Sequence, residues 1–243
     1  MADAPAAGPF AGQVALVTGA SKGIGAATAK ALAAAGVHVI LTARDAKALE
    51  AVEEAIFASG GSATIAPVDL AEPEGIARLA AGIGQRWQVL DILVLDAAYF
   101  PQLTPLVQLD SREFNKTLTL NLMAQQALLA HCDRMLRASK DARVIALTSS
   151  VGREPRAYWG AYAASKAALE ALLVAYAKEN QAISNIRVAI VDPGATRTAM
   201  RARAYPGEDP ASVKPPEAVA ERLVALLGEP FPTGHRERVN PVP

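Results

Sequence analysis

The chain has 243 residues, which suits one large α/β domain or two small ones, and 51% of them are hydrophobic while only 5% are aromatic. Its formal net charge is zero and its pI is about 6.8, so the composition indicates no basic surface for nucleic acid or an anionic membrane. Cys132 is the only cysteine, which excludes an internal disulfide and fits a reducing compartment.

The first eleven residues are rich in Ala, Pro and Gly and lack the basic and apolar regions of a signal peptide. We expect residues 1–11 to form a flexible tail and residues 12–243 to form a single domain. No run of 18 apolar residues follows, so no transmembrane helix is predicted. These features together predict a cytoplasmic protein.

Short apolar runs alternate with longer helical patterns along the rest of the chain. The apolar runs are residues 14–18, 37–41, 63–68, 92–95, 144–147 and 186–191. The helical patterns are residues 24–35, 46–59, 74–86, 112–137, 161–181 and 217–227. Such alternation indicates βαβ units with right-handed crossovers, so we predict a doubly wound parallel sheet of about seven strands in a three-layer αβα arrangement.

Residues 199–216 interrupt this regular pattern. Five Pro or Gly residues fall in the segment, at positions 206, 207, 210, 215 and 216. A long loop inside a compact α/β domain often covers an active site. We therefore expect residues 199–216 to form a mobile lid over a substrate, and a merely tolerated insertion is the alternative.

A glycine-rich turn follows the first predicted strand, because residues 18–25 read Thr-Gly-Ala-Ser-Lys-Gly-Ile-Gly. Glycine permits a tight turn in which backbone N–H groups reach a pyrophosphate, and the following helix adds the partial positive charge of its N-terminus. A strand before and a helix after the turn are the context of a dinucleotide site, although an ordinary strand–helix turn is the alternative. The expected cofactor contacts are Gly19, Ser21, Lys22, Gly23, Ile24 and Gly25.

The end of the second predicted strand indicates which dinucleotide binds. NAD sites place an acidic side chain there against the ribose 2′-OH, but this chain has Ala43 followed by Arg44. Arg44 and Lys22 together suit a 2′-phosphate, which the Arg fork can bind through two hydrogen bonds. We therefore predict NADP(H), whereas an inward-pointing Asp45 would favour NAD(H).

Tyr162 and Lys166 stand four residues apart among strong helix formers, so they share one face of a predicted helix. A free tyrosine has a pKa of about 10, and an adjacent cation lowers that pKa. This pair is therefore expected to act as a proton donor and acceptor near neutral pH. By itself, the spacing also fits a solvated helix face.

Several motifs, which follow one another in the expected order over residues 13–234, resemble those of the classical short-chain dehydrogenase/reductase family. The resemblance implies the Rossmann-type doubly wound sheet of that family. The motifs are the turn at 18–25, Asp69 and Leu70, Asn121, Ser149 thirteen residues before Tyr162, the Tyr162/Lys166 pair, and the Pro-Gly segment 192–198. Segments 159–162 and 196–201 are most similar to a bacterial subgroup of uncharacterised oxidoreductases.

One segment departs from the family pattern. The family usually has Asn-Asn-Ala-Gly after its fourth strand, and this chain has Leu95-Asp96-Ala97-Ala98. A carboxylate thus replaces an amide. We expect backbone N–H groups to neutralise its charge, or the bracing of the central sheet to be weaker.

The resemblance implies hydride transfer between a nicotinamide and a carbonyl or alcohol carbon. Tyr162 would act as the general acid/base, and Lys166 would lower the Tyr162 pKa and bind the nicotinamide ribose. Ser149, with Ser150 as its alternative, would donate a hydrogen bond to the substrate oxygen. Asn121 would hold a proton-relaying water, or else bond across helices. Further implied cofactor contacts are Asp69, Leu70, Asp96, Ala97, Ala98, Pro193, Gly194, Thr196 and Thr198.

For the substrate pocket we nominate residues that follow strand ends or begin the lid, where such sheets bind ligands. They are Tyr99, Phe100, Leu103, Tyr158, Trp159 and Met200. Because aromatic residues are scarce in this chain, their clustering favours an apolar or ring-bearing substrate. A subunit interface is the alternative for Tyr158 and Trp159.

We therefore expect an NADP(H)-dependent carbonyl reductase or alcohol dehydrogenase that acts on a small molecule, without nucleic-acid or membrane partners. The departure at Asp96 motivates a non-catalytic NADP(H) sensor as the alternative, with an epimerase or dehydratase as a third. Family resemblance implies a homodimer or homotetramer through helices 112–137 and 161–181. His38, His131 and His235 fit no metal-ligand spacing, so no metal is expected.

Overall fold

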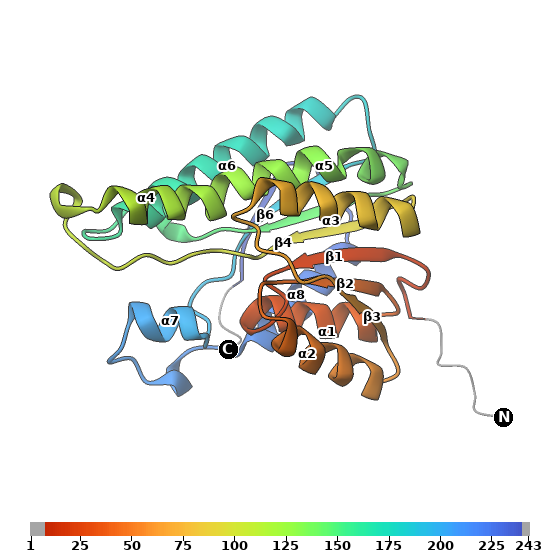
Figure 1. Cartoon of the computed structure of the whole chain (residues 1–243), viewed down its shortest axis with the longest axis horizontal. Coiled ribbons are helices and arrows are strands. Elements are labelled where there is room, and N and C mark those ends of the chain that lie inside the picture. The colour runs from red at the N-terminus through yellow and green to blue at the C-terminus, as the bar shows by residue number, and fades with distance from the viewer. Residues whose placement is uncertain (1–7, 240–243) are drawn as a thin grey trace.

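A computed structural model describes residues 8–239, which form a single seven-stranded sheet of parallel strands (Figure 1). The strands are β1 (Val14–Thr18), β2 (His38–Thr42), β3 (Ser62–Ile65), β4 (Ile92–Leu95), β5 (Arg143–Leu147), β6 (Arg187–Asp192) and β7 (His235–Arg238). Their spatial order is β3-β2-β1-β4-β5-β6-β7, so the direction of winding reverses between β1 and β4. The predicted doubly wound Rossmann-type sheet is confirmed.

Helices cover both faces of the sheet (Figure 1). One face carries α1 (Gly23–Ala34), α2 (Ala46–Ala58) and α8 (Pro216–Gly228), and the other carries α3 (Pro73–Arg86), α5 (Ala124–Ala138) and α6 (Gly160–Asn180). Within β1, Leu16 packs with the α3/α5/α6 cluster while Val17 packs with the α1/α2/α8 cluster. Because successive side chains point to opposite faces, a strand buried on both faces reads as a continuous apolar run.

The predicted helix over residues 112–137 is divided in the structure. It consists of α4 (Ser111–Leu118) and α5, joined by a π-helical turn, η2 (Thr119–Met123). A π turn inserts one extra residue into the helical repeat, and such turns are frequent at functional sites. The sequence pattern gave no sign of this turn, because apolar residues continue through it.

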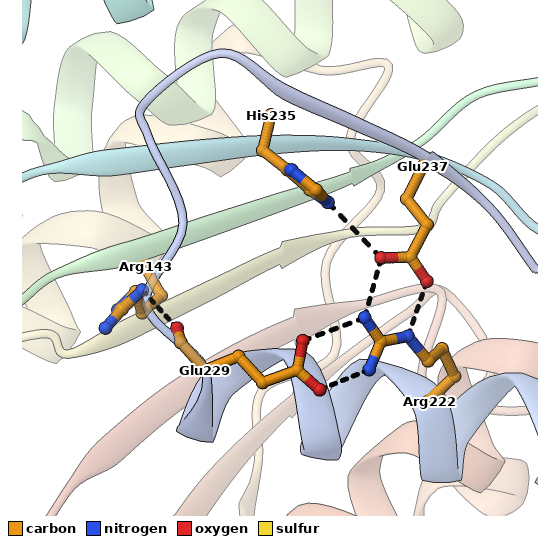
Figure 2. A network of polar contacts seen from close by, with 5 residues as sticks. All are labelled: Arg143, Arg222, Glu229, His235 and Glu237. Carbon is orange, nitrogen blue, oxygen red and sulfur yellow. Dashed lines mark hydrogen bonds and ion pairs between the residues drawn. The ribbon is translucent and has the colours of Figure 1, made fainter.

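The last strand, β7, was not visible as an apolar run because its sequence is His-Arg-Glu-Arg. Arg222 on α8 pairs with both Glu237 on β7 and Glu229, and His235 lies 3.2 Å from Glu237 (Figure 2). Strand β7 lies at the edge of the sheet, where charged side chains also discourage pairing with another chain. Charge pairing, rather than apolar burial, therefore attaches this strand to α8.

The N-terminal segment is ordered earlier than predicted. The backbone N–H of Phe10 donates to the carbonyl oxygen of Ala35 over 3.1 Å, and its side chain packs against the α1/α2/α8 cluster. Phe10 is thus attached to the domain, and residues 1–7 of the predicted tail lie outside the described part. Among the described helices, none is both long and apolar enough to cross a membrane.

Candidate active site

A cavity of about 600 Å³ opens at the carboxyl ends of the strands, where the winding reverses between β1 and β4. This is where open α/β sheets bind their ligands. The predicted cofactor contacts that line it are Gly19, Ser21, Lys22, Gly23, Ile24, Arg44, Asp69, Leu70, Asp96, Ala97, Ala98, Tyr162, Lys166, Pro193 and Thr198. Gly194 and Thr196 line a second, smaller cavity beside it, and Gly25 packs behind the glycine turn.

The glycine turn has the geometry expected of an anion-binding site. Gly19 and Gly23 adopt left-handed φ values of 69° and 58°, which other residues rarely adopt. A Cβ on Gly25 would lie only 2.4 Å from the carbonyl oxygen of Gly19, so the turn can close only around glycine. No side chain caps α1 and its first turn holds no acidic residue. Its N-terminal N–H groups therefore suit a bound phosphate, and the site fits a dinucleotide.

The residues that bear on cofactor choice lie at the rim of the large cavity. Arg44 is exposed there, directly after β2 and Ala43. The Asp45 carboxylate accepts a hydrogen bond from the Ala48 N–H over 3.1 Å and caps α2. The carboxylate that would have favoured NAD(H) is therefore engaged at the helix end.

Tyr162 and Lys166 lie on one face of α6, as predicted, and both are buried. Lys166 Nζ donates to the carbonyl oxygen of Leu147 over 2.8 Å and lies 5.8 Å from the centre of the Tyr162 ring. The Tyr162 hydroxyl faces Met200 Sδ at 3.9 Å. A solvated helix face is thereby excluded for this pair.

The electrostatic surroundings of Tyr162 differ from the expectation. Burial raises the pKa of Tyr162, and the carboxylates of Asp96 and Asp192 raise it further. Burial also lowers the pKa of Lys166 to about 8. The predicted net lowering of the Tyr162 pKa is therefore wrong for this structure, because the sequence argument counted the cation but not desolvation and two carboxylates. Tyr162 is a neutral phenol at pH 7 and can donate a proton.

The smaller cavity, of about 120 Å³, meets the large one at Tyr162, which lines both. Ser149 also lines this second space, whereas Ser150 lines neither cavity. Ser149 directly precedes a short 3-10 turn, η3 (Ser150–Gly152), whose Gly152 N–H donates to the Ser149 carbonyl oxygen over 3.0 Å. This turn places the Ser149 side chain on the same side as Tyr162.

An aromatic cluster forms the wall of the smaller cavity. The Phe100 ring meets Trp159 and Tyr162 edge-on, with centroid separations of 5.1 and 5.2 Å. Phe100, Trp159 and Met200, which were nominated for the substrate pocket, line this cavity, and Leu103 packs behind them.

Two of the nominated substrate residues point elsewhere. The Tyr99 hydroxyl donates to Glu113 over 2.7 Å, and Tyr158 is 61% exposed with a φ of 72°. Neither residue lines the large or the small cavity, so a substrate contact of Tyr99 or Tyr158 stays a prediction. Their hydrogen bonds and backbone geometry could not be read from position in the sequence alone.

Asn121 lies at the centre of the π turn η2 and is fully buried. Its Oδ1 accepts from the Tyr99 N–H over 2.6 Å, and its Nδ2 donates to the Tyr99 carbonyl oxygen and to Ser165 Oγ. The amide thus braces the loop after β4 against α6, which is the cross-helix role considered as its alternative. The proton-relaying water stays a prediction.

Asp96 occupies the space between the glycine turn and α6. It accepts a hydrogen bond from the Gly25 N–H and is attracted by Lys166, but burial outweighs both and raises its pKa to about 7. The Gly25 N–H thus stabilises the carboxylate only in part, because burial has the larger effect on its pKa. Thr18 Oγ1 accepts from the Asp96 and Ala97 N–H groups over 3.0 and 3.1 Å, so the strand end after β4 remains braced.

Sequence reasoning missed several residues that surround Tyr162 and Lys166. Thr148 lines both cavities and donates to the buried Glu170 over 2.7 Å, and Glu170 also pairs with Arg236 on β7. Glu170 follows Lys166 by four residues on α6, so its place on the same helix face was available as a signal. The contact with Arg236 was not, because it spans 66 residues. Arg197, in the Pro-Gly segment, also lines the large cavity and was not nominated.

Comparison with known proteins agrees with this site. A family model described as short chain dehydrogenase matches residues 13–209. The chain belongs to the short-chain dehydrogenase family. It is 34% identical to the uncharacterized oxidoreductase YciK of Escherichia coli K12, over 89% of this chain and 86% of YciK.

Solved structures of family members superpose closely. The yciK oxidoreductase from E. coli matches with a TM-score of 0.91 and 33% identity, over 96% of each chain. A chain from Shigella flexneri 2a, solved as a complex with NADP, matches with a TM-score of 0.91 and 33% identity, over 96% of this chain and 98% of that one. At least one family member of this similarity has therefore been solved with NADP bound.

Proposed function

We propose that this chain is an NADP(H)-dependent oxidoreductase that transfers hydride between the nicotinamide and a carbonyl or alcohol carbon of a small molecule. One observation carries the proposal: the buried Tyr162 hydroxyl stands where the 600 Å³ cavity meets the 120 Å³ cavity. A dinucleotide in the first space and a small substrate in the second would meet at this phenol.

The residues of the chain would contribute binding, orientation and proton transfer. A bound nicotinamide supplies or accepts the hydride. Tyr162, kept neutral by burial, would protonate a developing alkoxide, and Ser149 would donate a hydrogen bond to the same oxygen. Lys166 would hold its positive charge beside them, anchored on the carbonyl oxygen of Leu147. The aromatic wall of the smaller cavity would exclude water from the reacting atoms.

The test of this function follows loss of the near-ultraviolet absorbance of NADPH with a panel of aldehydes, ketones and quinones. Oxidation of NADPH should fall by about 10²–10⁴-fold in Tyr162→Phe, because the proton donor is removed, while NADPH affinity is kept. Tyr158→Phe is the matched control, since that exposed ring lines neither cavity, and it should retain activity. Equal activity of the Tyr162→Phe and wild-type proteins would refute the assigned role.

A preference for NADP(H) over NAD(H) is part of the proposal. Its support is the exposed Arg44 with Lys22 at the cavity rim, and the engagement of Asp45 in capping α2. Arg44→Ala should weaken NADPH binding by about 10–100-fold and leave NADH binding nearly unchanged, because a charge-assisted pair with phosphate is lost. Arg78→Ala, an exposed arginine of α3 away from the cavity, is the control.

A non-catalytic NADP(H) sensor is the second candidate, and the observation that favours it is the carboxylate of Asp96 at the back of the cavity. Tight NADPH binding with no turnover of any substrate in the panel would support the sensor. Assembly as a homodimer or homotetramer and a cytoplasmic location remain predictions.

A further inference from the structure

We propose that Arg197 is a cofactor-binding residue that pairs with the pyrophosphate of NADP(H) at the base of the lid. The inference rests on the proposed use of NADP(H) and adds a contact to that same site. Arg197 lines the large cavity and stands two residues before the predicted lid, residues 199–216. It follows β6 whereas Arg44 follows β2, and β1, β4 and β5 lie between these two strands in the sheet.

The backbone of Arg197 is held rigidly. Its N–H donates to the carbonyl oxygen of Lys214 over 2.8 Å, next to a parallel bridge between Thr196 and Lys214. The Thr198 hydroxyl accepts from the Arg201 N–H over 3.1 Å and so caps α7 (Ala199–Ala204), the first helix of the lid. Both ends of the lid are thus joined at Arg197, which presents a fixed side-chain origin to the cavity.

The position of this lid base relative to α1 identifies the part of the ligand that it faces. Thr198 Cγ2 lies only 3.5 Å from the position that a Cβ of Gly23 would take. The lid base therefore stands against the uncapped N-terminus of α1, where a pyrophosphate is expected. Arg197 precedes Thr198 and lines the same cavity, so we infer that its guanidinium adds to those backbone donors.

The charges around the cavity leave Arg197 for an anionic ligand. Lys22, Arg44 and Arg197 line the cavity, and within residues 8–239 none of them forms an ion pair with a carboxylate. By contrast, Arg201 in the lid pairs with Glu208, at 2.5 Å. Lys166 also lines the cavity, but it is buried and its Nζ donates to the carbonyl oxygen of Leu147. With Arg44 and Lys22 assigned to the 2′-phosphate end, Arg197 is the exposed cation that remains for the bridging phosphates.

The pyrophosphate role and a 2′-phosphate role predict different binding patterns. Arg197→Ala should weaken NADPH and NADH by the same factor, about tenfold or more, because both carry the pyrophosphate. Adenosine 2′-monophosphate, which lacks it, should bind Arg197→Ala and wild type equally. Arg44→Ala should show the opposite pattern, losing NADPH and adenosine 2′-monophosphate but not NADH. Arg197→Lys should fall between wild type and Arg197→Ala, since a point charge replaces the fork.

Calorimetric or fluorescence titration of the three ligands gives the measurement, with the thermal midpoint of the free protein as the folding check. Loss of NADPH binding without loss of NADH binding in Arg197→Ala would overturn the pyrophosphate assignment, as would unchanged binding of both. Wild-type protein that binds neither dinucleotide would refute the proposed function itself, which separates the two failures.

Discussion

The large and the small cavity that meet at Tyr162 are built in different ways. The large one is formed by backbone groups and strand ends, each supplied by a short segment such as the glycine turn. Its rim carries Lys22, Arg44 and Arg197, which form no ion pair with a carboxylate in the described part of the chain. The small one is formed by side chains from distant segments, with Phe100, Trp159, Met200 and Tyr205 in contact only after folding. The large cavity therefore depends on several short segments that are each recognisable in the sequence, whereas the shape of the small cavity depends on tertiary packing.

Removal of the aromatic wall tests whether the small cavity can be disrupted without loss of the large one, and it has the largest expected effect. Phe100→Ala should lower the free energy of unfolding by about 4 kcal/mol, because a buried ring that contacts Trp159 and Tyr162 leaves a cavity. Turnover should fall with it, while NADPH affinity at low temperature is retained. Denaturant unfolding and NADPH titration provide the two measurements.

Phe57→Ala is the control for that change, since the Phe57 ring is 53% exposed on α2 and should cost less than about 0.5 kcal/mol. If Phe100→Ala reduced the free energy of NADPH binding by as much as the free energy of unfolding, the large cavity would depend on the aromatic wall. That result would contradict the separate construction of the two cavities.

Asp96 tests the region that the two cavities share, through pH. Its pKa is raised by burial from 3.8 to about 7, so between these values the folded protein holds a proton that the unfolded chain releases. The free energy of unfolding therefore falls as pH rises from about 4 to 7, by up to about 4 kcal/mol at 1.36 per pKa unit. Asp96→Asn should lack this decline and be more stable than wild type at pH 7.5, but not at pH 4.

Thermal unfolding of both proteins across that window measures the difference. Lys166 adds an opposite trend at higher pH, because its lowered pKa of about 8 makes the folded state bind fewer protons than the unfolded state above that value. The comparison should accordingly stay below pH 8. Parallel pH profiles of Asp96→Asn and wild type would show that Asp96 is charged and stabilised throughout, contrary to its burial.

The fold and the large cavity were predictable because their determinants are short. Apolar runs gave the strands from β1 to β6, and the turn at residues 18–25 gave the dinucleotide site. Strand β7 escaped notice because its four residues are His or charged residues, and its ladder with β6 and the pairing of Arg222 with Glu237 leave no apolar pattern (Figure 2). The π turn around Asn121 was hidden within a continuous helical pattern.

Sequence reasoning missed features of the site for one physical reason. A sequence pattern shows neither how deeply a side chain is buried nor which residues far along the chain contact it. The pKa of Tyr162 was predicted from Lys166 alone, but desolvation and the carboxylates of Asp96 and Asp192 determine its direction. The Tyr99 hydroxyl donates to Glu113, a contact that the sequence pattern did not indicate. The glycine turn required no such knowledge, because its chemistry resides in its own backbone.

The smallest expected effect concerns Asp45 and decides between two roles for one carboxylate at the cavity rim. As the N-cap of α2 it should stabilise the protein, so Asp45→Ala should lower the free energy of unfolding by about 1 kcal/mol, and Asp45→Asn should restore most of that loss. Neither change should weaken NADH binding, because the capping carboxylate is not available to a ribose hydroxyl. If Asp45→Ala instead reduced NADH affinity with little change in stability, the carboxylate would serve the ribose. The rim of the large cavity would then hold, besides its cations, a carboxylate that favours NAD(H).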